Sequence, residues 1–184
     1  MGGIIRIEAP VLLTQAHDTS QFDCGDAVLD DWLRHRAWDN LLIAASRTYV
    51  VCPTDSRQII GYFALSMGQI LAREVTGAMR RNMPPAIPAV LLGRLAIDRA
   101  WQGQGIGRAL IAEVLRRALI ALREVSARLV IVHAISPAAE AFYRHHGFTR
   151  LPVETPTLAL DLVKFSKLSE TLTIPENSAI ILKN

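Results

Sequence analysis

Seven consecutive residues, Gln-Gly-Gln-Gly-Ile-Gly-Arg at positions 102–108, carry the clearest chemical signal in the sequence. They lie between an apolar run of strand length at 90–97 and an amphipathic run at 110–122. The first turn of a helix has unpaired backbone N–H groups with partial positive charge, and glycine lets a phosphate approach the backbone closely. The segment therefore predicts a loop that binds a pyrophosphate between a strand and a helix.

Two common phosphate loops do not fit this segment. A P-loop ends in Gly-Lys-Ser or Gly-Lys-Thr, and a Rossmann loop has a glycine three positions after its second glycine. Position 108 is arginine, which rules out both patterns. Glycines that only form a tight turn are the structural alternative, but the strand-loop-helix context favours phosphate binding.

The elements around the loop predict a mixed α/β fold. An amphipathic helix follows the loop, and a second helix begins at Ser136-Pro137 and ends at Gly147. Apolar and β-branched runs predict strands at 48–52, 59–65, 90–97, 129–132 and 157–165. The first two strands flank a turn-rich segment and should form an antiparallel hairpin.

An amino-terminal helix is expected at 23–37. The side chains expected on its apolar face are Val28, Leu29, Trp32 and Leu33. The side chains expected to point away from that face are Asp26, Asp30 and Arg34. We interpret Trp32 as a core residue rather than a ligand contact.

Composition limits the class of protein. Hydrophobic residues make up 51% of the chain and the mean hydropathy is +0.25, which predicts a globular core. No apolar run reaches the roughly 18 residues that span a bilayer, and the amino end lacks a signal peptide, so we expect a cytoplasmic protein with no membrane partner. Cys24 and Cys52 lack paired metal-ligand spacing, so we expect buried thiols and no metal.

Arginine supplies all but three of the 20 basic residues, and arginine suits phosphate better than lysine does. A GC-rich genome explains this bias equally well. Between positions 73 and 99, five arginines face only two acidic residues. Arg80 and Arg81 lie there in a proline-containing segment that should be an exposed loop, where a polyanionic partner could dock.

Two ordered motifs resemble those of the GNAT superfamily of acetyltransferases. Gln102, Gly105 and Gly107 fill its Q/R-x-x-G-x-G/A pyrophosphate loop, and residues 138–148 resemble the A-x-x-F-Y-x-x-x-G-F segment after the next strand. The resemblance implies a mixed, mostly antiparallel central sheet with splayed central strands, flanked by helices. It also implies acetyl-CoA as the co-substrate and no metal.

The same resemblance assigns roles to individual residues. Acetyl-CoA would lie between the splayed strands, with its pantetheine arm on Leu95, Ala96 and Ile97. Tyr143 would protonate the departing CoA thiolate, and a role as a core aromatic residue is the alternative. The remaining implied cofactor contacts are Gln102, Gly103, Gln104, Gly105, Ile106, Gly107, Arg108 and Phe142.

The candidate general bases are weaker. Solvated charge or helix capping accounts for Glu140, His145 and His146, and His133 is interpreted as a satisfied core histidine. A substrate α-amine with a pKa of about 8 is already partly neutral at cellular pH. A dedicated base is therefore unnecessary for an α-amine, whereas lysine acetylation would have more need of one.

Several further segments resemble one GNAT branch, the TacT-like toxins, over about residues 10–165. This likeness implies an enzyme that acetylates the α-amine of aminoacyl-tRNA and blocks translation. It also implies a homodimer and a ribbon-helix-helix antitoxin as partner. The residues expected to contact tRNA are Arg36, Arg80, Arg81 and Arg94. The segments that carry the likeness are 23–25, 29–33, 45–50, 80–84 and 93–98.

Two other functions stay open. One is a GNAT enzyme acting on a small-molecule amine or a protein amino terminus, and the arginine-rich segment argues mildly against it. The other is a non-catalytic CoA-binding module, against which Tyr143 speaks. Residues 1–168 are expected to form the acetyltransferase domain, followed by a carboxy-terminal tail at 169–184 with no assigned role.

Overall fold

An antiparallel hairpin joins strands β3 (Arg47–Val51) and β4 (Gly61–Leu71). Tyr49 lies opposite Phe63 in this pair, and their rings stack with centroids 5.1 Å apart. Cross-strand aromatic pairs of this kind stabilise a sheet and fix its register. The hairpin predicted around the turn at 53–56 is confirmed, although β4 runs six residues beyond the predicted end.

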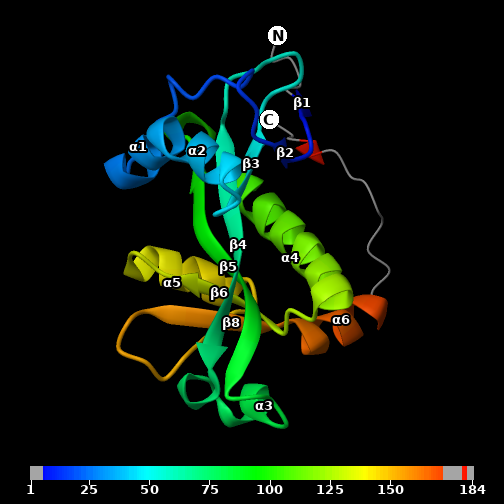
Figure 1. The fold of residues 1–184 in the computed structure, drawn as a ribbon. Coiled ribbons are helices and arrows are strands. Elements are labelled where there is room, and N and C mark those ends of the chain that lie inside the picture. Colours follow the sequence, from blue (N-terminus) through cyan, green and yellow to red (C-terminus); the bar gives the residue numbers. More distant parts are fainter. Residues whose placement is uncertain (1–5, 172–179, 182–184) are drawn as a thin grey trace. The chain divides into compact units, whose positions relative to one another are not determined.

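The computed structural model describes residues 6–171 and 180–181. Within that part, the chain forms two compact units. The first contains residues 6–65, 94–113 and 180–181, and the second contains residues 66–93 and 114–171. Strands β4 and β5 (Ala86–Ile97) and helix α4 (Ile106–Val125), which are labelled in Figure 1, contribute residues to both units.

The main sheet has the strand order β2-β3-β4-β5-β6-β8-β7. β5 and β6 pair in parallel, whereas β3 is antiparallel to both β2 and β4, and β8 to both β6 and β7. The predicted mixed, mostly antiparallel sheet is therefore confirmed. The bounds of its other strands are β2 (Val11–Leu12), β6 (Leu129–His133), β7 (Thr149–Arg150) and β8 (Thr157–Asp161).

The parallel ladder between β5 and β6 is short. It runs from the Ala89–Leu129 pair to the Leu92–Val132 pair. β5 continues to Ile97, and no further pairing with β6 is found in the described part of the chain. The parallel pairing therefore ends before residues 95–97, the backbone segment that the family resemblance assigns to pantetheine.

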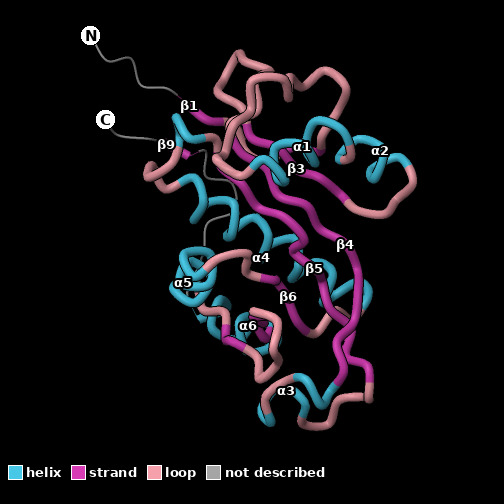
Figure 2. The backbone as a smooth tube through the Cα atoms, turned by 90° about the vertical axis from the view of Figure 1, so that its left-hand side faces the viewer, coloured by secondary structure: helices cyan, strands magenta, loops and turns pink. Residues whose placement is uncertain are grey.

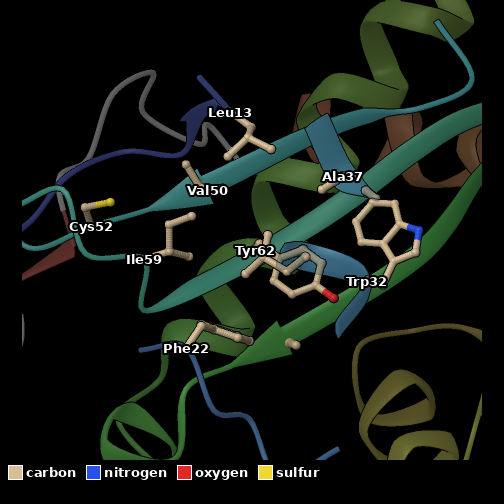
Figure 3. Close-up of a cluster of buried hydrophobic side chains, with 11 residues drawn as sticks. Leu13, Phe22, Trp32, Ala37, Val50, Cys52, Ile59 and Tyr62 are labelled. Atoms are coloured by element: carbon tan, nitrogen blue, oxygen red, sulfur yellow. The ribbon is translucent and has the colours of Figure 1, made fainter. Parts of the chain in front are cut away.

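Helices α1 (Ala27–His35) and α2 (Ala37–Leu42) lie beside β3 in the first unit (Figure 2). Their apolar residues meet those of β3 and β4 in a buried cluster, shown in Figure 3. Burial of this apolar surface is the main force that holds helix and strand together. The largest side chains of the cluster are Phe22, Trp32, Leu33, Ile59 and Tyr62.

Helix α1 starts later than predicted. Asp26 is its N-cap, and the Asp26 carboxylate accepts a 2.9 Å hydrogen bond from the N–H of Val28. Val28 is 72% exposed and Asp30 is 6% exposed, so the predicted faces are wrong for both residues. The reason is tertiary, because the preceding loop packs against the helix and the Asp30 carboxylate accepts the N–H of Cys24 at 2.9 Å.

The second unit has its own buried cluster, built between α3 (Gly77–Arg80), β5, β6 and β8. Helix α5 (Pro137–His145) follows β6, as predicted. Ser136 caps it by accepting the N–H of Ala139 at 3.1 Å, and Gly147 follows its end with a φ of +89°. Short 3-10 turns lie at Ala72–Glu74 in this unit and at Arg99–Trp101 in the first.

The last predicted strand, at 157–165, is only partly right. β8 ends at Asp161, and helix α6 (Leu162–Thr171) begins at the next residue. The Asp161 carboxylate accepts the N–H groups of Val163 and Lys164 at 3.0 and 3.2 Å, which is an N-cap geometry. The apolar residues after Asp161 therefore continue as a helix.

The tail predicted at 169–184 divides in the structure. Its first three residues end α6, and strand β9 (Ile180–Ile181) pairs antiparallel with β1 (Arg6–Ile7). Residues 172–179 and 182–184 lie outside the described part. Cys52 is buried as expected, whereas Cys24 is only partly buried. No helix in the described ranges is long and apolar enough to cross a bilayer.

Candidate active site

The loop between β5 and α4 presents a row of free backbone donors. Helix α4 begins at Ile106, and Ala109 is the first residue whose N–H reaches back, to the carbonyl of Gly105 at 3.2 Å. Within residues 6–171 and 180–181, no acceptor is found for the N–H groups of residues 103–108. Six consecutive amides at a helix start therefore remain available to an anion.

Two glycines of the loop have a left-handed backbone. Gly103 has a φ of +75° and Gly105 a φ of +82°, a region that costs side-chain-bearing residues about 1–2 kcal/mol. A Cβ added at either position would meet no atom within 4 Å. Positions 103 and 105 therefore require glycine because of their backbone conformation and not because of crowding. The open space beside them leaves room for a ligand.

Gln102 holds the loop in place. Its side-chain Nε2 donates to the carbonyl of Cys24 at 3.0 Å and to that of Ile97 at 2.9 Å. Its own N–H donates to the carbonyl of Arg99. Gln102, predicted as a cofactor contact, therefore has its donors engaged by the protein, and the structure gives it an anchoring role.

Asp98 makes a second link between the loop and the segment before α1. Its buried carboxylate accepts the N–H of Ala100 at 2.9 Å and the N–H of Asp23 at 3.1 Å. Arg99 forms an exposed ion pair with Asp23 at 3.3 Å. The Asp23-Cys24-Gly25 segment is thus tied to the entrance of the glycine loop, a role that sequence reasoning missed.

The other residues of the first unit that were predicted to contact the cofactor could bind it mainly through main-chain groups. The Ile106 and Ala96 side chains are buried, while Leu95 and Ile97 are half-buried. Gln104 is exposed, and its side chain donates to the carbonyl of Ala100 at 3.2 Å. Gly107 is half-buried and Arg108 is exposed. A ligand along this segment would bind main-chain groups.

Tyr143 lies in the second unit, on α5. It is 6% exposed, and its ring makes edge contacts with Phe142 at 5.3 Å and Phe148 at 5.6 Å between centroids. Burial raises the pKa of the Tyr143 phenol to about 12, so the hydroxyl carries its proton throughout the neutral range. The hydroxyl has no hydrogen-bond partner among the described residues. Phe142, predicted as a cofactor contact, packs on Tyr143 and on the His146 ring.

Residues 45–150 match the family model described as an acetyltransferase (GNAT) domain. A curated relative, the tRNA-acetylating toxin of Mycobacterium tuberculosis (strain ATCC 25618 / H37Rv), is 38% identical over 152 residues, which cover 83% of this chain and 90% of the relative. The chain belongs to the GNAT acetyltransferase family. It is therefore an acetyltransferase, as the motifs predicted.

Solved structures of GNAT toxins have the same fold. A crystal structure of a KacT mutant matches with a TM-score of 0.84 and 27% identity, over 89% of this chain and 99% of KacT. AtaT complexed with acetyl-methionyl-tRNAfMet matches with a TM-score of 0.81 and 30% identity, over 89% of this chain and 98% of AtaT. Other AtaT structures hold acetyl-CoA or the carboxyl terminus of the antitoxin AtaR.

Two of the three candidate bases on α5 of this GNAT protein, Glu140 and His146, have polar partners. Glu140 forms ion pairs with Arg144 and Arg150, both at 3.7 Å. The His146 ring nitrogen Nδ1 is 2.7 Å from the carbonyl oxygen of Phe142, and His145 packs against the His146 ring. The His146 contact agrees with the predicted helix capping, whereas Glu140 is held in ion pairs and is not simply a solvated charge.

His133 has a partner but is not a core residue. Its Nδ1 lies 2.9 Å from the Thr157 hydroxyl oxygen, as expected of a satisfied histidine. The residue is exposed, so its predicted place in the core is wrong. The reason is that it is the last residue of β6, where its side chain faces the outside of the unit.

The four arginines predicted to contact tRNA divide between the units. Arg36 and Arg94 belong to the first, and Arg80 and Arg81, which are exposed, belong to the second. None of the four has an ion pair with a described carboxylate. Arg94 is half-buried, with its guanidinium carbon 4.2 Å from the centroid of the Trp32 ring. Sequence reasoning assigned Trp32 to the core and missed this contact.

Proposed function

We propose that this GNAT enzyme transfers the acetyl group of acetyl-CoA to the α-amine of aminoacyl-tRNA and thereby acts as a toxin that blocks translation. The main observation that supports acetyl-CoA binding is the row of six unpaired amides at residues 103–108. The relatives support aminoacyl-tRNA as the acceptor, because one is named a tRNA-acetylating toxin and another was solved with an acetylated aminoacyl-tRNA.

The loop residues fit a diphosphate. Amides 103–108 would hold its oxygens, with the partial positive charge of the α4 amino end adding to the attraction. The main chain of residues 95–97 would hold the pantetheine arm, because the β5–β6 ladder ends at Leu92. Phe142 would contact the cofactor from α5. When bound, acetyl-CoA supplies an activated acetyl thioester.

Tyr143 supplies the proton that the leaving thiolate requires. With a pKa raised to about 12, the phenol is protonated at every physiological pH and cannot act as a base there. A phenol is a weak acid toward a thiolate of pKa about 8.5, so the transfer depends on alignment rather than on equilibrium acidity. Tyr143 is thus the proposed catalytic acid.

The proposed acceptor has little need of a protein base, although His145 on α5 is exposed and its ring only packs against that of His146. Glu140 and His146 are held by Arg144, Arg150 and the Phe142 carbonyl. An α-amine with a pKa of about 8 is already partly uncharged near neutral pH. Such an amine can attack the thioester without a protein base, whereas a lysine side chain could do so far less readily.

Arginines without carboxylate partners would bind the RNA backbone. Arg36, Arg80, Arg81 and Arg94 are the proposed contacts, and each can donate two parallel hydrogen bonds to a phosphate. Arg80 is the last residue of α3 and Arg81 is its C-cap; both are exposed, which suits contact with a backbone that approaches from solvent. Binding through these residues should be salt-dependent and insensitive to RNA sequence.

The proposal extends to partners and location. AtaT was solved with the carboxyl terminus of its antitoxin, which supports an antitoxin partner for this chain as well. We place that antitoxin in the ribbon-helix-helix class and the enzyme in a homodimer, in the cytoplasm where charged tRNA is found. Residues 1–168 would form the acetyltransferase domain, with residues 169–184 as an accessory tail.

The test is a comparison of acceptors. Purified protein is incubated with labelled acetyl-CoA and either bulk aminoacyl-tRNA, the same tRNA after deacylation, or free amines and peptides. We expect label on the charged tRNA and none on the deacylated tRNA. Equal or faster turnover of free amines or peptides would reject the toxin function while leaving the acetyltransferase family assignment intact.

A further inference from the structure

A column of stacked rings in the first unit ends on an arginine. The Trp32 and Tyr62 rings are nearly parallel, with an interplanar angle of 15° and centroids 5.9 Å apart (Figure 3). Phe22 meets the other side of Tyr62 edge-on at 5.5 Å. The Arg94 guanidinium carbon is 4.2 Å from the Trp32 ring centroid. The order of the column is therefore Phe22, Tyr62, Trp32 and Arg94.

The rings of this column are fixed in the core. Phe22 and Tyr62 are fully buried, and Trp32 is 8% exposed. The Tyr62 hydroxyl donates a 2.8 Å hydrogen bond to the carbonyl of Leu29, which joins β4 to α1. Because close-packed rings cannot shift without disturbing their neighbours, the position of the Trp32 face is set by the core. The cation stacked on that face is positioned with it.

The acids of α1 that lie closest in sequence to Trp32 do not pair with Arg94. Asp26 caps the helix, Asp30 accepts the N–H of Cys24, and Asp31 pairs with Arg34. No carboxylate within the described residues forms an ion pair with Arg94. Burial without an anion is unfavourable for a cation, and it lowers the pKa of Arg94.

A stacked guanidinium keeps its N–H edge for a ligand. The Arg94 guanidinium carbon lies over the indole ring, and the guanidinium N–H donors have the fork geometry that matches a phosphate. Arg36, one helical turn after Trp32, also lacks a carboxylate partner in the described ranges. Arg36 therefore adds a second cation at the carboxyl end of the helix that carries the supporting ring.

We propose that Trp32 is a positioning residue for the RNA acceptor: it holds the Arg94 guanidinium so that its N–H edge binds a phosphate of the aminoacyl-tRNA. This inference rests on the proposed function, because the phosphate is that of the tRNA substrate. Trp32 touches no substrate itself and acts through Arg94. Its loss should therefore matter only while Arg94 is present.

A double-mutant cycle tests this dependence, with bulk aminoacyl-tRNA as the acceptor. Arg94→Gln and Trp32→Leu are each expected to raise KM for the tRNA roughly tenfold, with kcat and the Kd for acetyl-CoA within about twofold of wild type. The double variant should have the KM of Arg94→Gln alone. Arg94→Gln should also lower the salt dependence of tRNA binding by about one phosphate contact.

Two further variants separate positioning from core packing. Leu33→Ala removes a buried neighbour on α1 and should reduce stability without changing KM for the tRNA. Trp32→Phe keeps an aromatic core residue with a smaller face and should give an intermediate KM. If Trp32→Leu raises KM as much in the Arg94→Gln background as in wild type, Trp32 is only a core residue and the inference is wrong.

The outcomes also separate this inference from the proposed function. A wild-type enzyme that acetylates aminoacyl-tRNA, combined with additive effects of the two substitutions, rejects the role of Trp32 alone. A wild-type enzyme that leaves aminoacyl-tRNA unmodified but acetylates other amines overturns both the proposed function and the inference that depends on it.

Discussion

The side-chain Nε2 of Gln102 donates a 3.0 Å hydrogen bond to the carbonyl oxygen of Cys24, a residue 78 positions earlier in the chain. The same nitrogen donates to the carbonyl of Ile97 at 2.9 Å. One amide group therefore joins the segment before α1, the end of β5 and the glycine loop. The free amides of the loop follow directly after this anchor.

Replacing Gln102 with alanine should loosen the loop. Two hydrogen bonds are lost, each with a net contribution of about 0.5–1.5 kcal/mol, so we expect the Kd for acetyl-CoA to rise roughly tenfold. Isothermal titration calorimetry measures this Kd. Gln21→Ala is the matched control, because among the described residues the side chain of Gln21 donates a hydrogen bond only to the neighbouring Ser20. An unchanged Kd in Gln102→Ala would show that the anchor is dispensable.

Replacing Gly105 with valine should block cofactor binding. The φ of +82° disfavours a β-branched residue by about 1–2 kcal/mol, and the added side chain would stand in the open space beside the free amides. We expect no measurable acetyl-CoA binding in calorimetry. Gly77→Ala should bind normally, since Gly77 has an ordinary φ and an added Cβ there meets nothing within 4 Å. Wild-type affinity in Gly105→Val would contradict the diphosphate site.

Removing the Tyr143 hydroxyl should reduce the chemical step alone. Tyr143→Phe keeps the ring contacts with Phe142 and Phe148 but removes the only proton that the side chain can give. We expect kcat for acetyl transfer to fall by about 10²–10⁴, growth inhibition to disappear, and the Kd for acetyl-CoA to stay near wild type. Turnover at the wild-type rate would remove Tyr143 from its assigned role.

The raised pKa of Tyr143 predicts a specific pH profile. Burial raises this pKa from the ordinary tyrosine value of 10.0 to about 12, so the acid form is complete below about pH 10 and is lost only as pH rises through 12. The initial rate of acetyl transfer should rise with pH up to about 8, as the substrate amine loses its proton. The ratio of wild-type to Tyr143→Phe rates should then stay constant to pH 10. A ratio that falls near pH 8 would mean that the phenol ionises far earlier than its burial implies.

Local signals in the sequence were sufficient to predict the glycine loop and helix α5. A left-handed backbone requires glycine at 103 and 105, and Ser136-Pro137 with Gly147 marks both ends of a helix. These constraints act over a few residues, so they can be recognised without knowledge of the fold. The same holds for the β3–β4 hairpin, whose turn residues are contiguous.

Contacts between distant segments could not be predicted in this way. Helical periodicity predicted that Asp30 points away from the core. In the structure the Asp30 carboxylate is buried, because it accepts a hydrogen bond from the N–H of Cys24. The stacking of Arg94 on Trp32 joins β5 to α1, and no spacing rule connects residues so far apart. Asp98, tied to Asp23, is a third example. In each case a polar or charged group has a partner that only the tertiary fold supplies.

Asp161 shows how one residue can change the end of a strand into the start of a helix, and its replacement should be destabilising. Its carboxylate caps α6 and also forms a 2.7 Å ion pair with Arg128, whose side chain is 21% exposed against 13% for Asp161. Asp161→Ala should lower the free energy of unfolding by about 3 kcal/mol, because it removes the cap and leaves the Arg128 charge unpaired. Asp161→Asn keeps a capping oxygen and should cost about 1 kcal/mol less.

Urea denaturation measures the free energy of unfolding of both variants. Asp31→Ala is the control, since the exposed ion pair between Asp31 and Arg34 should contribute under about 0.5 kcal/mol. Equal losses in Asp161→Ala and Asp31→Ala would mean that the apolar residues of α6, rather than the Asp161 cap, decide where β8 ends.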